Sequence, residues 1–321
     1  MEKKLLQHQP RILVIEDEQG MKTSYFPGLA WNGMGYSFPV EQKSIPTKTS
    51  RENPMISSGP AFLDEQTPVS VSDPRFVDID RTGKISSAKR ILRDISRQLE
   101  SANQDFSFVS DKLLLESQAY LHSNLLYLIA ATDGNEDTVG HSQLVARYTL
   151  LLTKAMGIED RAFFSEIERG ALLHDIGKIG IPDSILRKRW PLTDKEREII
   201  KEHPYLGYEM VEEFPFLNKA SWVVLFHHES FDGRGYPYGL KGEDIPLEAR
   251  IFAIADTLDA ITSDRPYRKG QSFRVALDEI ERVRGTQFDP AIVDAFLSVP
   301  EEKCQQIKLE MEKSHSMYSI H

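Results

Sequence analysis

The sequence has a single cysteine, Cys304, among its 321 residues. One thiol excludes a disulfide framework and a thiolate cage around a metal, and it suits a reducing compartment. Basic residues are also outnumbered, since 39 Lys and Arg stand against 49 Asp and Glu, for a net charge of −10. This balance argues against a nucleic-acid-binding surface, which needs clustered positive charge. A small phosphate-bearing ligand in a local basic pocket remains compatible with it.

Long apolar runs are missing as well. No stretch approaches the roughly 18 apolar residues that a membrane span requires. The N-terminal "MEKKLLQHQP" lacks the apolar core of a secretion signal. We therefore expect no membrane span and a cytoplasmic location. With 40% hydrophobic residues, the chain can still bury a sizeable core.

Residues 1–83 show no sustained apolar periodicity, and 20–75 are rich in Pro, Gly, Ser and Thr. This composition is typical of a poorly ordered segment. The stretch "RILVIEDEQ" at 11–19 resembles the first strand and acidic pair of a response-regulator receiver domain. The roughly one hundred further residues of alternating strand and helix that such a domain needs are absent. We interpret 11–19 as a short apolar segment or a relic.

Residues 84–131 are predicted to form a long helix or coiled-coil linker. Within 84–113, apolar side chains alternate by four and three residues, which is a heptad pattern. The pattern comprises Ala88, Leu92, Ile95, Leu99, Ala102, Phe106, Val109 and Leu113. So narrow a seam usually faces another helix, which favours a homodimer through 84–113. The alternative is an amphipathic helix that lies on its own globule.

Residues 132–300 are predicted to form an all-α domain, followed by a C-terminal tail at 301–321. Apolar periodicity marks helical segments at 141–157, 161–173, 194–202, 205–214, 218–229, 247–262, 272–284 and 290–298. "TDKE" at 193–196 is a capping box, with Thr193 as the N-cap and Glu196 three residues on.

Imidazoles and carboxylates recur in this region. Asp137 and His141 are four residues apart and would share a helix face, which taken alone is more typical of a surface contact. His174, Asp175 and Asp256 each follow an apolar run, so they should be buried. Buried ionisable groups need partners, and a metal ion would serve both His174 and Asp175.

Three further histidines extend the set. His203 precedes Pro204 and therefore suggests a helix junction. His227 and His228 would point about 100° apart on a helix, so they suit two neighbouring ions, although one buried and one exposed histidine is the simpler reading of that pair alone. The complete candidate ligand set is Asp137, His141, His174, Asp175, His203, His227, His228 and Asp256.

Imidazole with carboxylate suits Fe, Mn, Zn or Ni more than Mg or Ca. Eight ligands exceed what one ion needs, so two or three ions are implied, with Asp175 able to bridge them. Two close ions lower the pKa of a shared water and hold the oxygens of a phosphoryl displacement, which favours phosphodiester hydrolysis by a hydroxide between the metals. Lys178 lies about one helical turn after His174, and Arg265 and Arg268 follow Asp256 by 9 and 12 residues. All three could bind phosphate, or be solvated surface charges.

The motifs "HDIGK" (174–178), "HP" (203–204), "HHESFDGRGYP" (227–237) and "DTLDAITSDRPYR" (256–268) resemble, in order and spacing, the HD-GYP subgroup of the HD phosphohydrolases. The resemblance covers 132–300 and implies a helical bundle that hydrolyses the bacterial messenger cyclic di-GMP to pGpG, and in many members to GMP. It further implies two or three divalent ions, most often Fe or Mn.

The resemblance assigns His141, His174, Asp175, His203, His227, His228 and Asp256 as metal ligands, with His174, Asp175 and Lys178 at the catalytic centre. It places Lys178, Arg265 and Arg268 at the phosphates of the substrate. Members with a third metal carry glutamate where this chain has the shorter Asp137, so a third ion and rapid cleavage to GMP are in doubt.

The Gly-Tyr-Pro loop comprises Gly233, Gly235, Tyr236 and Pro237. The glycines allow backbone turns that a side chain would block. By resemblance, this loop implies contact with partners such as diguanylate cyclase domains.

Three other functions fit the same residues. One is a non-catalytic module that binds cyclic di-GMP or a protein partner, which the intact ligand set argues against. Another is hydrolysis of a different cyclic dinucleotide or nucleotide. A redox di-iron enzyme is the third, and the Gly-Tyr-Pro signature argues against it.

Overall fold

The structure is a computed structural model that describes residues 13–16, 22–25, 79–104, 121–126, 128–129, 136–188, 190–264 and 269–318. The chain divides into two compact units, Met1–Ser70 and Val71–His321.

In the first unit, strand β1 (Leu13–Glu16) pairs antiparallel with β2 (Lys22–Tyr25), with Leu13 opposite Tyr25. The receiver-like segment thus supplies one strand of a hairpin, whereas the sheet of a flavodoxin-like receiver domain is mostly parallel. Within 20–75, the stretch predicted to be poorly ordered, the structure describes only β2. A strand of four residues with the sequence "KTSY" is too short and too polar to show apolar alternation.

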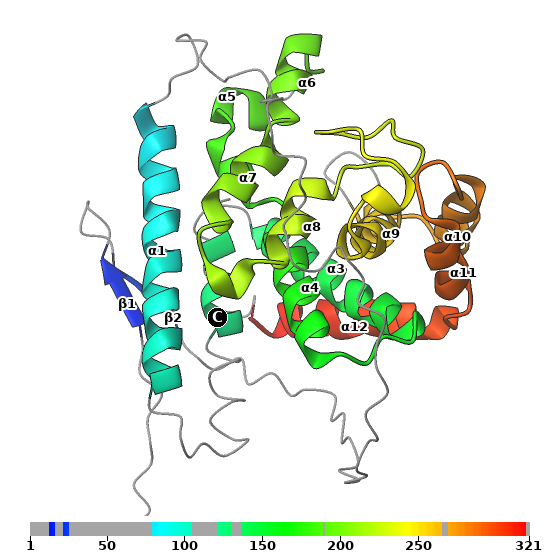
Figure 1. The fold of residues 1–321 in the computed structure, drawn as a ribbon, viewed down its shortest axis with the longest axis horizontal. Helices are drawn as coiled ribbons and strands as arrows, with labels where there is room; N and C mark the ends of the chain where they lie inside the picture. The colour runs from blue at the N-terminus through cyan, green and yellow to red at the C-terminus, as the bar shows by residue number, and fades with distance from the viewer. Residues whose placement is uncertain are drawn as a thin grey trace, which may run out of the picture. The chain divides into compact units, whose positions relative to one another are not determined.

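The described part of the second unit is built from helices, so the predicted all-α class is confirmed (Figure 1). Its α-helices are α1 (Ile79–Gln104), α3 (Glu136–Ala155), α4 (Arg161–Leu173), α5 (Asp183–Leu186), α6 (Asp194–Ile200), α7 (His203–Val211), α8 (Ala220–Phe226), α9 (Leu247–Thr262), α10 (Phe273–Arg282), α11 (Pro290–Leu297) and α12 (Glu301–Tyr318). Short 3-10 helices are η3 (Ile176–Gly180), η4 (Pro215–Leu217) and η5 (Gly242–Asp244). None of the described helices combines the length and apolarity needed to cross a bilayer.

Helix boundaries lie close to the predicted ones. The capping box is present, because Thr193 accepts from the Glu196 backbone N–H and the Glu196 carboxylate accepts from Thr193 N at 2.7 Å. Beyond residue 300, where the predicted domain ends, the chain continues as α12, which packs against α3 and buries Cys304. The thiol is thus part of the core, which explains a cysteine in an otherwise charged stretch.

The core lies between helices that are far apart in the sequence. Helix α3 packs against α4 and α9, α4 packs against α8, and α7 packs against α8 and η3. Fully buried Tyr148, Leu172 and Phe252 come from α3, α4 and α9 respectively. The ends of α4 and α8 lie close to the middle of α9, where His174 and His227 both contact the Phe252 ring.

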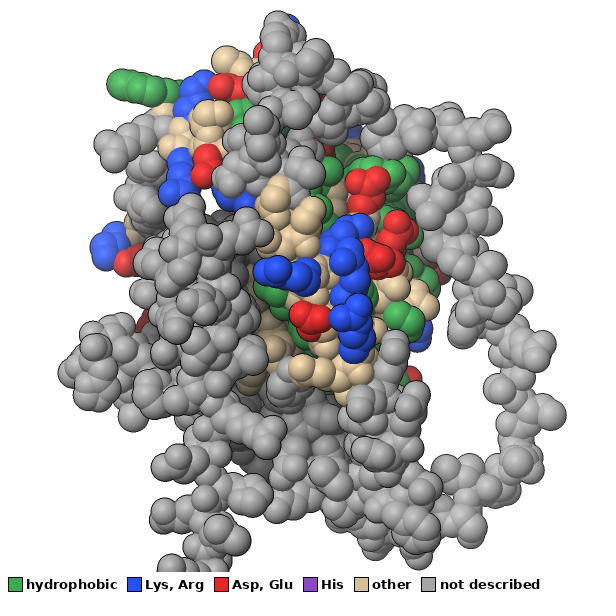
Figure 2. Space-filling model, turned by 90° about the vertical axis from the view of Figure 1, so that its left-hand side faces the viewer, with side chains coloured by type: hydrophobic (Ala, Val, Ile, Leu, Met, Phe, Trp, Pro, Cys, Tyr) green, Lys and Arg blue, Asp and Glu red, His purple; other side chains and the backbone are tan. Residues whose placement is uncertain are grey.

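The heptad seam of α1 lies against the chain's own core. Ala88, Leu92 and Ile95 are buried, Leu99 is partly buried against the same cluster, and α1 packs on η3 and α7. Figure 2 shows the side on which α1 lies, where Lys and Arg mingle with Asp and Glu. The burial of Ala88, Leu92 and Ile95 therefore favours the amphipathic-helix alternative, and the homodimer through 84–113 stays a prediction. The side chain of Ala102 and the seam positions 106, 109 and 113 lie outside the described residues.

Candidate metal centre

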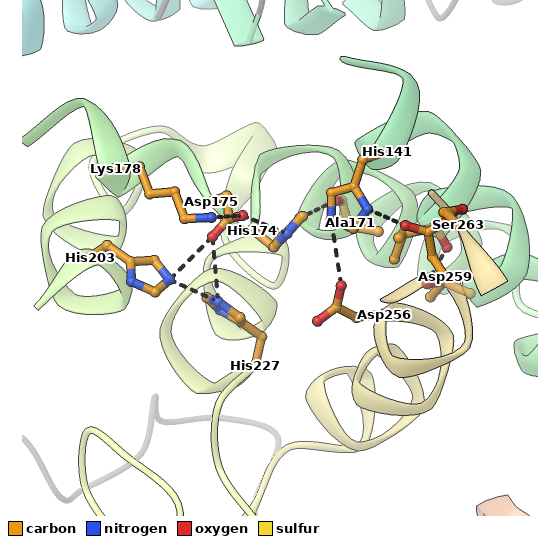
Figure 3. Close-up of polar contacts among 12 residues, drawn as sticks. His141, Ala171, His174, Asp175, Lys178, His203, His227, Asp256, Asp259 and Ser263 are labelled. Carbon is orange, nitrogen blue, oxygen red and sulfur yellow. Dashed lines mark hydrogen bonds and ion pairs between the residues drawn. The ribbon is translucent and has the colours of Figure 1, made fainter. Parts of the chain in front are cut away.

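The centre is assembled from four helix termini and two helix interiors (Figure 3). His141 comes from α3 and Asp256 from α9, while His174 and Asp175 lie between α4 and η3. His203 begins α7, and His227 and His228 directly follow α8. The structure thus brings together predicted ligands from all five sequence segments. Asp137 belongs to the backbone of α3, but its side chain lies outside the described residues.

Two groups of ligand atoms are present, each with its atoms within 4.8 Å of one another. The His141 group contains His141, His174 and Asp175, and the His203 group contains His203, His227 and His228.

Asp175 connects the two groups. Its Oδ2 lies 3.1 Å from His174 Nε2, and its Oδ1 lies 3.2 Å from His203 Nε2 and 3.9 Å from His227 Nε2. One carboxylate therefore faces both groups, which is the position expected of a bridging ligand.

Three of the histidines share one local arrangement. The Nδ1 atom of each lies near the backbone carbonyl three residues earlier: His174 with Ala171 at 2.9 Å, His203 with Ile200 at 2.7 Å and His227 with Val224 at 2.9 Å. A carbonyl oxygen can only accept, so each Nδ1 carries the proton and donates it. Carbonyls at helix ends lack helical partners, and the imidazoles satisfy them. The arrangement fixes the tautomer and leaves each Nε2 to face the centre.

The donor set fits a cation. With both Nδ1 atoms protonated, the Nε2 atoms of His203 and His227 are both acceptors, yet they lie 3.1 Å apart in the interior. Two facing acceptors need a shared positive charge, and a divalent ion that prefers nitrogen and carboxylate ligands would supply it. The ring of Phe252 packs on His174, with centroids 4.8 Å apart, and forms an apolar wall of the site.

Electrostatics keep His227 and His228 neutral. Burial, followed by the neighbouring imidazoles His228 and His203, holds the pKa of His227 well below its usual value. Burial and His203 lower the pKa of His228 to about 3. Both rings are therefore neutral near pH 7 and can offer a lone pair to a metal.

The charge of Asp175 is also fixed. Burial alone would raise its pKa, but Lys178, His174 and His203 outweigh that effect and hold the pKa well below the ordinary range. Lys178 Nζ lies 2.5 Å from Asp175 Oδ2, with 31% of the Lys178 side chain exposed. Burial would lower the pKa of His174, but the Asp175 and Asp256 carboxylates raise it. Arg265 and Arg268, the other predicted phosphate-binding residues, lie outside the described residues.

Asp259 holds His141 in place, and the sequence analysis missed it. His141 Nδ1 lies 2.6 Å from Asp259 Oδ2, and Ser263 Oγ donates to Asp259 Oδ1 at 2.5 Å. His141 Nε2 then points to Asp256, 3.5 Å from its Oδ1. Asp256 itself is less buried than predicted, with 28% of its side chain exposed, because it lies at the open edge of the cluster. The available signal was the spacing of three residues between Asp256 and Asp259, which places both on one face of α9.

We expect Asp259→Asn to weaken metal binding by about tenfold to a hundredfold, as usual when a carboxylate behind a metal-binding histidine is lost. The asparagine amide has about the same volume as the carboxylate, but its NH2 group cannot accept a hydrogen bond from His141 Nδ1. Equilibrium dialysis against Mn(II) measures the effect, and Ser263→Ala, which removes only the outer hydrogen bond, should lose less. Equal Mn(II) affinity in Asp259→Asn and the unsubstituted chain would show that Asp259 does not orient His141.

The Gly-Tyr-Pro loop folds back onto the centre. Gly233 has φ +85°, a conformation that side chains rarely adopt, which confirms the expected role of this glycine. A Cβ at Gly235 would lie 2.3 Å from the backbone nitrogen of Ser230, so only glycine fits there. The peptide bond between Tyr236 and Pro237 is cis. The Tyr236 ring stacks on the His228 imidazole, with centroids 4.6 Å apart.

Comparisons with known proteins agree with this site. A family model described as the HD domain matches residues 127–292. The chain is similar to the cyclic di-GMP phosphodiesterase response regulator RpfG of Xanthomonas campestris pv. campestris, with 38% identity over 214 residues, covering 64% of this chain and 56% of that protein. It is also similar to a cyclic di-GMP phosphodiesterase of Thermotoga maritima, with 38% identity over 182 residues, covering 56% and 49%. A 3'3'-cGAMP-specific phosphodiesterase 3 of Vibrio cholerae is 36% identical over 172 residues, covering 52% and 37%.

The chain spans about half the length of these curated relatives, or less. The family match covers half of the chain and includes both ligand groups, together with the helices that carry them. His141, His174, Asp175 and Asp256, whose imidazole and carboxylate atoms face one another, all lie within the matched residues. This chain belongs to the HD domain family.

Proposed function

We propose that the chain is a metal-dependent phosphodiesterase that hydrolyses the bacterial second messenger cyclic di-GMP to pGpG. The observation that carries this proposal is the position of Asp175, whose two oxygens face imidazoles of two separate groups. The substrate class is supported by the similarity to proteins named as cyclic di-GMP phosphodiesterases and by the motifs "HDIGK" and "HHESFDGRGYP".

In this proposal, the His141 group with Asp256 would hold one divalent ion and the His203 group would hold a second, with the Asp175 carboxylate next to both groups. Such ions, Fe or Mn by the resemblance, would activate water and neutralise phosphate charge. The chain's own residues do the rest. The backbone carbonyls fix the histidine tautomers, Phe252 excludes water from one side of His174, and Lys178 offers a partly exposed cation next to Asp175.

The direct test is an assay of the full chain loaded anaerobically with Fe(II) or Mn(II). Cyclic di-GMP should be converted to pGpG, and pGpG should accumulate ahead of GMP if Asp137 does not support a third ion. Chromatography of the products separates the two nucleotides. No turnover with any divalent metal would remove the claim of catalysis, and tight binding without product would identify a binding module.

The competing substrate is a cyclic GMP-AMP dinucleotide, because two relatives from Vibrio cholerae carry that specificity in their names. Equimolar cyclic di-GMP and 3'3'-cGAMP in one reaction give the ratio of kcat/KM values directly. Faster consumption of 3'3'-cGAMP would replace the proposed substrate without changing the proposed chemistry.

We expect Lys178→Ala to raise KM and lower kcat/KM by about tenfold to a hundredfold, since a hydrogen bond to a charged group contributes about 1.5–3 kcal/mol. Metal content should stay near that of the unsubstituted chain, because Lys178 provides no ligand atom to either group. Lys195→Ala, an exposed lysine on α6, is the matched control. Metal loss in Lys178→Ala equal to its loss of activity would instead mean that Lys178 acts only by holding Asp175.

The contact of the Gly-Tyr-Pro loop with a diguanylate cyclase domain stays a prediction. Arg234, next to Gly235, pairs with Asp232 at 3.5 Å and keeps 88% of its side chain exposed, so the loop offers an accessible cationic side chain to a partner. Binding of a purified diguanylate cyclase domain to the full chain, compared with Arg234→Ala, measures this contact.

A further inference from the structure

Glu229 is a buried carboxylate next to the metal centre that provides no ligand atom to either group. It lies directly after His228 in the sequence, and only 4% of the residue is exposed. Its Oε1 accepts from the backbone N–H groups of Tyr238 at 2.8 Å and Gly239 at 3.1 Å, and its Oε2 accepts from Leu240 N at 3.0 Å. One side chain therefore fixes three consecutive backbone groups of the loop.

The segment that Glu229 holds leads directly to His228. Tyr236 N donates to the His228 carbonyl at 3.1 Å, and the Tyr236 ring stacks on the His228 imidazole at an interplanar angle of 26°. The close approach of Gly235 to the backbone of Glu229, where a Cβ would lie 2.4 Å from Cα, keeps the loop against this stretch. Carboxylate, loop and imidazole thus form one continuous set of contacts.

His228 differs from the other histidines of the centre in how its ring is held. His174, His203 and His227 each donate Nδ1–H to a backbone carbonyl, and Asp259 accepts from His141. Within the described residues, the contacts of the His228 ring are with other rings, namely those of His203, His227 and Tyr236. Of these, only Tyr236 lies outside the ligand set, so its stacking is what can set the direction of the His228 ring.

We propose that Glu229 is a positioning residue for His228. Its carboxylate holds the backbone at 238–240, this places the Tyr236 ring, and the ring directs the His228 imidazole toward His203 and His227. The inference rests on the proposed function in one respect, since it requires that the His203 group binds a metal ion.

The test is a titration of the full chain with Co(II) alone, followed by the visible absorption of the bound ion, so that no turnover is needed. Glu229→Ala and Tyr236→Ala should each weaken Co(II) binding by about tenfold to a hundredfold and change the absorption bands, as expected when the support of one ligand is lost. The double variant should bind no more weakly than the weaker single variant, within about twofold, because both changes act through the same contact. Glu243→Ala, an exposed carboxylate in η5 of the same loop, should bind Co(II) like the unsubstituted chain.

Glu229→Gln gives a graded result. Its amide oxygen can still accept from Tyr238 and Gly239, but its nitrogen cannot accept from Leu240. Its loss of Co(II) affinity should therefore fall between those of Glu243→Ala and Glu229→Ala. If Glu229→Ala does not fold, Glu229→Gln with Tyr236→Ala completes the same cycle.

Two results would overturn the inference alone: an unchanged Co(II) affinity in Glu229→Ala, or additive losses in the double variant, which would mean that the residues act separately. Failure of the unsubstituted chain to bind Co(II) would overturn the proposed metal centre together with this inference. Normal Co(II) binding without hydrolysis of cyclic di-GMP would overturn only the proposed activity.

Discussion

Asp175→Ala is expected to abolish turnover, with a loss on the order of 10³-fold or more, and to lower the bound metal. Asp175 is the one described residue whose oxygens lie within 4 Å of imidazoles from both groups. Alanine would leave those imidazoles without a shared anion and would leave Lys178 without its partner at 2.5 Å. Metal analysis of the purified chain, paired with product chromatography, measures both effects.

A matched control separates the loss of a ligand from a general loss of negative charge. Asp278 lies in α10, is 56% exposed at its side chain and pairs with Arg274 at 3.0 Å on the surface. Asp278→Ala removes the same carboxylate and should leave both metal content and activity unchanged, because exposed ion pairs contribute little. His174→Ala should resemble Asp175→Ala. Full activity with retained metal in both His174→Ala and Asp175→Ala would show that the centre lies elsewhere.

That these imidazoles and carboxylates gather in one place could be predicted, because their chemistry is visible in residue types. Imidazoles and carboxylates after apolar runs, as at His174 and Asp175, must find partners when they are buried. Their arrangement in space could not be predicted, since the 3.1 Å approach of His203 Nε2 to His227 Nε2 depends on how α7 packs against α8.

The supporting carboxylates were harder to find. Glu229 directly follows the predicted ligand His228, and Asp259 lies three residues after the predicted ligand Asp256. The partner of Asp259 is His141, 118 residues away, and that of Glu229 is a backbone segment 9 to 11 residues later. A carboxylate that holds a ligand has the same sequence pattern as one on a solvated helix face, and only tertiary contacts distinguish them.

The helices themselves were predictable from apolar periodicity, as α4 and α9 show by matching the predicted 161–173 and 247–262. What the apolar face of a helix packs against could not be predicted. The seam of α1 has the same spacing whether Leu92 and Ile95 face a second copy or the chain's own core, and the structure places them in the core. Periodicity reports that a face is buried and leaves open what covers it.

Among residues that provide no metal ligand, we expect Gly177→Ala to cause the largest loss of stability. A Cβ at this position in η3 would lie 1.9 Å from the His203 carbonyl oxygen and 2.5 Å from Gly207 N, both backbone atoms that cannot rotate away. Helix α7 would have to move off η3, and the 3.2 Å contact of Asp175 with His203 would open with it. Overpacking of this kind costs about 3 kcal/mol or more, which lowers Tm by roughly 6 to 12 °C.

Gly83→Ala distinguishes this clash from the general effect of adding a methyl group. Gly83 lies in α1, and a Cβ there would meet no atom within 4 Å. Alanine favours the helix by about 0.5–1 kcal/mol relative to glycine, so Gly83→Ala should keep or slightly raise Tm. Gly177→Ala should lose both Tm and bound Mn(II), and excess Mn(II) should restore only part of the Tm because the displaced backbone keeps His203 away from Asp175. If the two variants have the same Tm and bind Mn(II) equally, then the packing of η3 against α7 does not fix the positions of the two ligand groups relative to each other.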